Sequence, residues 1–341
     1  MLPNSPFFNY LAALPSFVQS HKRLPRPMRS ARANINDFVF GRMIRDKWNL
    51  LQQACVDKEY AKLFVSGASK DVRVAQTLAI FDIAQHTTVD DLAYWLAPFH
   101  GMRVVAKATH SSNCILFLNR PLDMAQLEAF LYRAKKNFFH RMRETQYGKL
   151  ERKIILEEYL GDERGVNDYK FFCSYGEVFY CQVDIDRFVN HRSGLFSVPD
   201  FMPVKRKSAA APLTDLPKPL RFDQMVQIAA DLSQFFDFVR VDLYDSADGI
   251  YFGEYTFTPA AGCVRSFDGK IGVDLLNRIR TTSSPVRCNS HLPAGPGRGR
   301  GLVQPAFRPA LLAAPHPEPI LGTGPAVVEQ VVSLPVEGPA L

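Results

Sequence analysis

The sequence predicts an α+β fold built from two packed lobes. The chain has 341 residues, of which 47% are hydrophobic, so it can bury a core large enough for two lobes. Segments with helical periodicity alternate with short runs rich in β-branched and aromatic residues. Two such regions, 169–183 and 238–257, each contain a pair of runs joined by a turn, which is typical of antiparallel strands.

The elements follow in order. Residues 35–65 have a helical pattern that is interrupted at Asp57-Lys58. Helices are predicted at 89–95, 122–139 and 222–235. Strands are predicted at 78–83, 103–109, 114–118, 153–160, 169–175, 178–183, 238–244 and 250–257. We expect four regions: a basic arm at 1–34, a lobe at 35–152, a second lobe at 153–280, and a tail at 281–341.

The composition narrows the class of binding partner but does not identify one. The net charge of +7 and pI near 9.1 suit nucleic acid, a membrane surface or an anionic small molecule. Much of the excess lies in residues 21–32, HKRLPRPMRSAR, which predict a solvated arm, with contact to a polyanion or membrane surface as the alternative. The tail is crowded with Pro and Gly, and we expect no fold there.

Targeting and metal signals are weak. The six cysteines show neither CxxC spacing nor a disulfide framework, which favours a reducing cytosol over zinc or redox chemistry. An apolar patch at 6–18 lacks a preceding basic segment, so we expect no signal peptide. No run of 18 uncharged apolar residues occurs, so a spanning helix is not predicted, while peripheral membrane contact stays open.

The most specific stretch is residues 238–262, FVRVDLYDSADGIYFGEYTFTPAAG, because charged side chains interrupt an apolar hairpin. If Tyr244 pairs with Ile250, then Arg240, Asp242 and Glu254 share one face, with Arg240 opposite Glu254. Two partly buried carboxylates need a balancing cation or proton, and hard oxygen ligands suit Mg²⁺. The alternative is a solvated face on which Arg240 neutralises Glu254.

Further polar groups follow other strands. Lys107 precedes the loop HSSN at 110–113, which predicts either a phosphate cradle or an ordinary edge-strand lysine. Glu157 and Glu158 lie at the end of a predicted strand. They could form a solvated strand end, or a hinge that hydrogen-bonds a purine and a ribose. Asp168 and Lys170 share a strand face, as an ion pair or as nucleotide contacts. Several charged residues gather at 182–192, where His191 suits a structural loop position better than a catalytic one: Asp184, Asp186, Arg187, His191 and Arg192.

In their order along the chain, the motifs VVAKATHSS, IILEEYL, DYKFFCSYGEVFYCQVDIDRFVNHR and VRVDLYDSADGIYFGEYTFTPAAG resemble the TupA-like branch of the ATP-grasp superfamily over residues 35–276. The resemblance implies two α+β lobes with antiparallel sheets that close on ATP.

It also implies roles for single residues, assigned here by their position in this sequence. Lys58 and Lys107 would contact ATP phosphates under a loop of His110, Ser111 and Ser112. The adenine hinge would be Glu157, Glu158, Tyr159 and Leu160, with Lys170 as a further nucleotide contact. Asp242 and Glu254 would hold Mg²⁺, and Arg240 would stabilise the moving phosphoryl group. Thr256 stands where many relatives have a metal-binding Asn, and Asn113 stands where a glycine is common.

The function implied is an ATP- and Mg²⁺-dependent ligase that joins a carboxylate to an amine through an acylphosphate, in polysaccharide or cell-wall polymer biosynthesis. Phosphoryl transfer requires positioning and charge balance more than a protein nucleophile, which fits these residues. The alternatives are a kinase or glycosyltransferase-like transferase, or a nucleotide-binding assembly protein with little turnover. We expect a cytoplasmic protein, possible association with membrane polysaccharide machinery at the inner face of the membrane, and no nucleic-acid partner.

Overall fold

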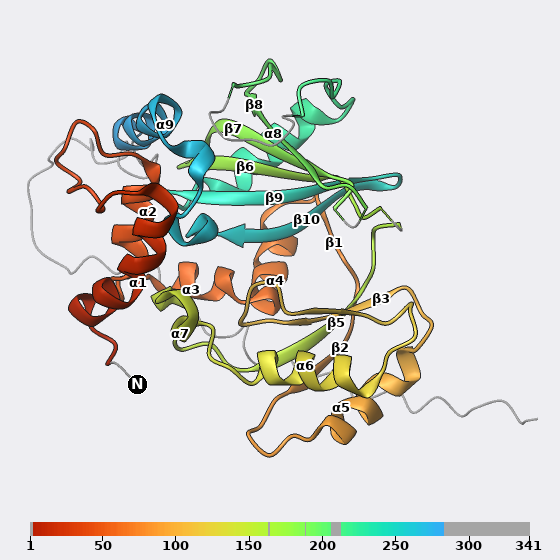
Figure 1. The fold of residues 1–341 in the computed structure, drawn as a ribbon. Coiled ribbons are helices and arrows are strands. Elements are labelled where there is room, and N and C mark those ends of the chain that lie inside the picture. Colours follow the sequence, from red (N-terminus) through yellow and green to blue (C-terminus); the bar gives the residue numbers. More distant parts are fainter. Residues whose placement is uncertain (1–2, 163, 188, 206–212, 283–341) are drawn as a thin grey trace, which may run out of the picture. The chain divides into compact units, whose positions relative to one another are not determined.

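The fold is built on two β-sheets. The computed structural model describes residues 3–162, 164–187, 189–205 and 213–282, within the compact unit Met1–Ser290 (Figure 1). Apart from its first two residues, the predicted tail at 281–341 lies outside the described residues. The sheets combine with flanking helices as an α+β architecture, in agreement with the predicted class.

The larger sheet has six strands in the order β1-β10-β9-β6-β7-β8. Its neighbours pair antiparallel except β1 and β10, which are parallel. The strands are β1 (Arg73–Val74), β6 (Asp168–Ser174), β7 (Glu177–Ile185), β8 (Arg192–Ser197), β9 (Val239–Ser246) and β10 (Gly249–Thr256). Both predicted hairpins, β6–β7 and β9–β10, are therefore present and lie next to each other.

Alternation along β9 determines what each face of the large sheet contacts. Val241 and Leu243 are buried in a cluster shared with α8 (Phe222–Ser233), α3 (Leu50–Val56) and α4 (Lys58–Ala68). On the opposite face, Phe238 packs with α2 (Ile35–Met43) and α9 (Lys270–Thr281) at one end of the sheet. The rest of that face carries the polar side chains of β9, and these line a pocket.

The smaller sheet has four strands in the order β2-β5-β3-β4. They are β2 (Thr77–Asp82), β3 (Val104–Ala108), β4 (Ile115–Phe117) and β5 (Lys153–Glu158). Helices α5 (Val89–Leu96) and α6 (Met124–Ala134) cover one face, where Leu92 and Phe130 are fully buried (Figure 1). Since β5 is an inner strand of this sheet, the predicted lobe boundary at residue 153 does not separate the two sheets.

Several elements differ from the sequence predictions. The helix expected at 122–139 ends at Ala134, because Asn137 accepts a hydrogen bond from the Phe139 backbone N–H at 3.0 Å and starts a new turn, α7 (Phe139–Met142). The sequence patterns did not identify α9, β1 or β8, nor the helix α1 (Pro6–His21). Short 3₁₀ turns complete the described elements: η1 (Ala97–Phe99), η2 (Thr145–Tyr147), η3 (Pro259–Gly262) and η4 (Arg265–Phe267).

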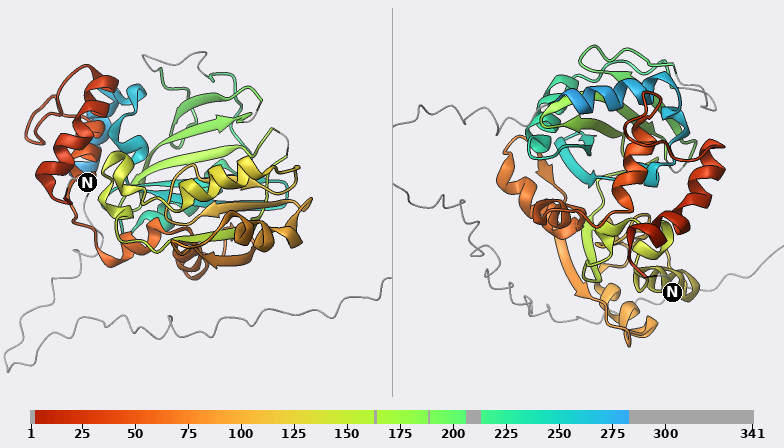
Figure 2. Two further views of the ribbon diagram at one scale, coloured as in Figure 1. Left: turned by 60° about the horizontal axis from the view of Figure 1, so that its bottom comes forward. Right: turned by 90° about the vertical axis from the view of Figure 1, so that its left-hand side faces the viewer.

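The basic segment expected to be a solvated arm is instead attached to the body of the protein. Phe17 of α1 is fully buried against Phe40 of α2, and both views of Figure 2 place the two helices side by side. Arg23 donates to Asp37 Oδ1 at 2.6 Å, and His21 Nδ1 lies 2.7 Å from Asp268 Oδ2. Among the described residues, no helix has the length and apolar character needed to cross a membrane.

Candidate active site

The β9–β10 hairpin differs in register from the sequence prediction. Tyr244 pairs with Tyr251 instead of Ile250, and a bulge lies between Phe252 and Glu254. Gly253 occupies the bulge, where an added Cβ would lie 2.9 Å from the Tyr244 ring and 3.1 Å from a backbone oxygen. The bulge places Asp242 directly opposite Glu254 and Arg240 opposite Thr256. All four side chains therefore share the pocket face.

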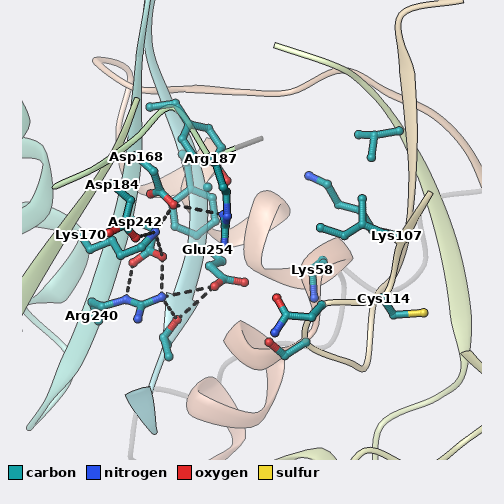
Figure 3. Close-up of a pocket in the computed structure, with 18 of the residues that line it drawn as sticks. Lys58, Lys107, Cys114, Asp168, Lys170, Asp184, Arg187, Arg240, Asp242 and Glu254 are labelled. Atoms are coloured by element: carbon teal, nitrogen blue, oxygen red, sulfur yellow. Dashed lines mark hydrogen bonds and ion pairs between the residues drawn. The ribbon is translucent and has the colours of Figure 1, made fainter. Parts of the chain in front are cut away.

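Arg240 joins the acidic side chains of this hairpin. Its Nε donates to Asp242 Oδ1 and its Nη2 donates to Asp242 Oδ2, both at 2.6 Å. Nη2 also donates to Thr256 Oγ1 at 3.0 Å and lies 3.4 Å from Glu254 Oε1. The Asp242 side chain is 2% exposed, whereas that of Glu254 is 40% exposed and extends into the pocket (Figure 3).

Lys170 of β6 contacts three carboxylates. Its Nζ lies 3.3 Å from Asp242 Oδ2 and 3.6 Å from Asp184 Oδ2, and it also contacts Asp168 Oδ2. Burial lowers the pKa of Lys170, and the adjacent carboxylates offset this only in part. The pairing of β6 with β9 brings Lys170 opposite Asp242, so adjacent strands build this cluster.

The donor set fits a divalent cation. Four carboxylates here face three cations, because Arg187 Nη1 also lies 3.6 Å from Asp168 Oδ2. This leaves a formal charge of about −1 (four negative, three positive) on Asp168, Asp184, Asp242, Glu254, Lys170, Arg187 and Arg240. Asp168 Oδ1 is buried without a hydrogen-bond partner. No described group of three or more His, Cys, Asp or Glu side chains forms a ready-made metal site. Mg²⁺, however, often takes only one or two carboxylates and completes its shell with phosphates and water.

Lysines form the opposite wall of the pocket (Figure 3). Glu157 of β5 accepts from Lys62 Nζ at 2.9 Å and from Lys107 Nζ at 2.6 Å. Burial opposes ionisation of Glu157, but the two lysines outweigh it and lower its pKa to about 2. Lys58, the first residue of α4, donates to the Ser111 carbonyl at 2.5 Å. Burial likewise opposes ionisation of Glu254, but the charges of Lys58 and Arg240 keep its pKa below the ordinary value.

The predicted phosphate loop reaches the pocket only through its second half. Ser112 and Asn113 line the pocket, and Asn113 adopts φ +58°, the left-handed conformation that explains why a glycine suits this position. His110 is buried, and its Nε2 lies 2.8 Å from the Ala134 carbonyl oxygen. His110 and Ser111 are therefore not among the side chains that line the pocket, contrary to the sequence prediction. Ser111 contributes its carbonyl to Lys58 instead.

The predicted hinge lines the pocket, but two of its N–H groups are already used within the protein. The Glu158 N–H donates to Gln76 O at 3.0 Å, and the Tyr159 N–H donates to Arg103 O at 2.8 Å. The Glu158 carboxylate accepts from the Gln76 N–H at 2.9 Å. Because Glu157 is held by lysines, its side chain does not serve as the free hinge carboxylate that the sequence suggested.

The acidic wall and the lysine wall enclose one pocket of about 530 Å³, a size typical of small-molecule sites. Of the predicted site residues, it is lined by Lys58, Lys107, Ser112, Glu157, Glu158, Tyr159, Leu160, Lys170, Arg240, Asp242, Glu254 and Thr256. Among the charged loop residues at 182–192, Asp184 and Arg187 line it as well. His191 is half exposed and lies 3.5 Å from Asp184, which suits an ion-pair partner, and Asp186 lies 3.6 Å from Arg192.

The sequence prediction missed three charged residues of the pocket, Lys62, Arg141 and Glu144. Lys62 is buried on the apolar face of α4 beside Ala61 and Val65, and a lysine at such a position is a signal that could have been used. Arg141 and Glu144 lie in a stretch for which the sequence pattern predicts no helix or strand, and neither position carries a comparable signal.

Solved structures with a similar arrangement are distant. A D-alanine–D-alanine ligase from Helicobacter pylori aligns at 10% identity and TM-score 0.38 over 68% of this chain and 59% of that one. The VanG D-Ala:D-Ser ligase from Enterococcus faecalis aligns at 15% identity and TM-score 0.37, over 67% and 61%. The ATP-grasp ligase PsnB, solved with a precursor variant, Mg and ADP, aligns at 14% identity and TM-score 0.34, over 67% and 60%. The chain thus spans about three-fifths of each.

Sequence comparison is more decisive. No curated protein matches the chain. The family model for TupA-like ATP-grasp proteins matches residues 41–277, which is more than half of the chain and contains both sheets and the whole pocket. The chain belongs to the TupA-like ATP-grasp family.

Proposed function

We propose that the protein is an ATP- and Mg²⁺-dependent ligase that activates a carboxylate as an acylphosphate and transfers the acyl group to an amine. The observation that carries this proposal is the charge arrangement of the pocket. Lys58 and Lys107 lie on one wall, and Arg240 with the Asp242–Glu254 pair lies on the other (Figure 3). A triphosphate between the walls would meet cations on one side and a metal-binding edge on the other.

Each group then has a role in phosphoryl transfer. Lys58 and Lys107 would bind phosphate oxygens, and Arg240, fixed by its two bonds to Asp242, would stabilise charge on the transferred phosphoryl group. Asp242 and Glu254 would hold Mg²⁺, which when bound neutralises phosphate charge. Asp242 is already engaged by Arg240, so Glu254 is the more accessible of the two ligands. The attacking nucleophile would be the substrate carboxylate, so no protein nucleophile is required.

The wider role we propose is the assembly of a surface polysaccharide or cell-wall polymer, with an amino acid joined to a sugar-derived carboxylate in the cytoplasm or at the inner face of the membrane. This role is what the resemblance of the sequence motifs to the TupA-like branch implies. The acidic acceptor fits the net charge of +7.

The test is ADP release by the purified full chain with ATP and Mg²⁺. The panel would combine D-glucuronate and D-galacturonate with glycine, L-alanine, L-glutamate and L-lysine. We expect full ADP release only when a carboxylate and an amine are both present. ADP release that needs a sugar hydroxyl and no amine would indicate a kinase and contradict the ligase proposal. ATP binding without any product would indicate an assembly protein.

A variant of Lys107 tests the lysine wall. We expect Lys107→Met to weaken ATP binding about tenfold to a hundredfold, because one charge-assisted hydrogen bond contributes roughly 1.5–3 kcal/mol. Isothermal titration calorimetry with ATP and Mg²⁺ measures this. The control is Lys149→Met, whose side chain is 66% exposed and pairs with Asp46 outside the pocket. An unchanged dissociation constant for Lys107→Met would show that this lysine only neutralises Glu157.

A further inference from the structure

Glu144 is a buried acid of the pocket with no place in the phosphoryl-transfer site described above. It is 6% exposed and lines the pocket together with Arg141, Tyr147 and Thr258. Its Oε1 accepts a hydrogen bond from Thr258 Oγ1 at 2.5 Å, and Gln146 Nε2 donates to the same Thr258 hydroxyl at 2.5 Å. No described residue donates to its Oε2. One oxygen is therefore positioned by the protein while the other remains available to a ligand.

The missing charge partner sets Glu144 apart. The other buried carboxylates that line the pocket each contact a lysine: Glu157, Asp168, Asp184 and Asp242. Among the described residues, Glu144 forms no ion pair, and burial raises its pKa to about 7 against the opposing effects of the Thr258 hydrogen bond and the more distant charge of Arg141. A buried carboxyl group without a cation is costly unless a proton or a ligand supplies the charge. Such groups are candidates for binding and proton transfer.

The position of Glu144 follows from the strand that carries the metal-binding edge. Glu254 and Thr256 lie two residues apart on β10 and project to the same side, while Thr258 follows the end of the strand and precedes η3. Glu254 belongs to the carboxylate pair, Thr256 contacts Arg240, and Thr258 contacts Glu144. Glu144 is thus held by a residue that directly follows β10, in the same pocket as Arg240 and Glu254.

We propose that Glu144 binds the ammonium group of a primary-amine substrate and accepts the proton that the amine must lose before it attacks. This inference rests on the proposed ligase function. The carboxylate form of Glu144 takes one proton from R–NH₃⁺, and the free amine attacks the carbonyl carbon of the acylphosphate. The C–N bond forms, and the C–O bond to phosphate breaks with its electron pair leaving on phosphate. The departing phosphate takes the second nitrogen proton, which yields an amide and HPO₄²⁻.

The experiment separates the two halves of the reaction. Hydroxylamine, largely neutral near pH 7, needs no base and traps an acylphosphate as a hydroxamate. In Glu144→Gln we expect amide formation with the panel amine to fall about 10²–10⁴-fold, the usual contribution of a general base. ATP- and carboxylate-dependent hydroxamate formation should continue at a rate close to that of the wild type. Amide formation should recover toward pH 9, where more of the amine is already deprotonated.

The controls address folding and other titrating groups. Glu128→Gln on the exposed side of α6 is the matched substitution and should keep both reactions. Arg141, Tyr147 and Cys263 are the other charged or titratable groups close to Glu144, and burial raises the pKa of both Tyr147 and Cys263. Thr258→Val, which removes the hydrogen bond to Glu144, should weaken amide formation more than hydroxamate formation.

The outcomes distinguish this inference from the ligase proposal. An equal loss of hydroxamate and amide in Glu144→Gln, or no loss of either, would overturn the role of Glu144 alone. A wild-type protein that forms no hydroxamate with any panel carboxylate would overturn the ligase proposal, and this inference with it.

Discussion

Replacing Asp242 by Asn or Glu254 by Gln is expected to reduce ADP release by at least about 10²–10³-fold, the usual cost of losing one group that stabilises charge in the transition state. Each change removes a negative charge from the edge proposed to hold Mg²⁺. Glu254→Gln is the cleaner variant, because its side chain is 40% exposed and holds Arg240 only through a 3.4 Å contact. Asp242→Asn also weakens the two 2.6 Å bonds to Arg240.

The measurement is ADP release across a Mg²⁺ titration, with thermal melting to confirm folding. In Glu254→Gln we expect a higher Mg²⁺ requirement as well as slower turnover, whereas a structural role would not change the Mg²⁺ dependence. Asp90→Asn on the exposed side of α5 is the matched control and should behave as the wild type. Unchanged ADP release in both pocket variants would refute the metal assignment.

The alternating pattern of the strands allowed much of the fold to be predicted. Apolar residues at every second position of β9 identify a strand with one face in the core, and the polar residues between them identify the face that carries chemistry. The register of the hairpin was predicted wrongly, because a bulge depends on how Gly253 packs against Tyr244 rather than on the periodicity. The bulge makes Asp242 and Glu254 direct partners across the two strands, so their side chains still share one face of the sheet.

Contacts between distant parts of the chain could not be predicted from the sequence alone. Lys62 and Glu157 are separated by 95 positions, and only the tertiary fold brings Lys62 of α4, a helix that packs on the large sheet, to Glu157 of β5 in the small sheet. The sequence therefore allowed Glu157 to be interpreted as a hinge carboxylate, whereas in the structure it accepts hydrogen bonds from Lys62 and Lys107. His110 followed a strand and a lysine as a phosphate-binding residue would, yet its ring turns to a helix carbonyl and away from the pocket. Side-chain direction in such loops is set by tertiary packing.

Lys170→Met is expected to destabilise the protein by about 3–5 kcal/mol near pH 7, the usual effect of removing one partner from a buried ionic cluster. The change leaves Asp168, Asp184 and Asp242 without their shared ammonium group, while methionine preserves most of the side-chain volume. Arg240 still compensates Asp242, and Arg187 still lies 3.6 Å from Asp168, so the penalty falls mainly on Asp184. Urea unfolding of the wild type and the variant measures the difference in free energy of unfolding.

The pH dependence of the stability loss in Lys170→Met shows whether the loss is electrostatic. Burial opposes ionisation of Asp184, but Lys170, together with hydrogen bonds from Ser193 and Gln182 and the charge of His191, lowers the pKa in the folded protein. This contribution to stability is therefore present above the unfolded value, about 3.9, and is lost as the pH falls through the folded pKa. Without Lys170, Asp184 loses its buried ammonium partner at neutral pH, whereas in acid it is protonated and neutral. The difference in stability should therefore be largest near pH 7 and shrink below about pH 4. Lys218→Met, which removes an exposed partner of Asp223, should cost at most about 1 kcal/mol at either pH. A loss in Lys170→Met that is the same in acid and at neutral pH would indicate a packing effect, and the electrostatic role of Lys170 would have to be abandoned.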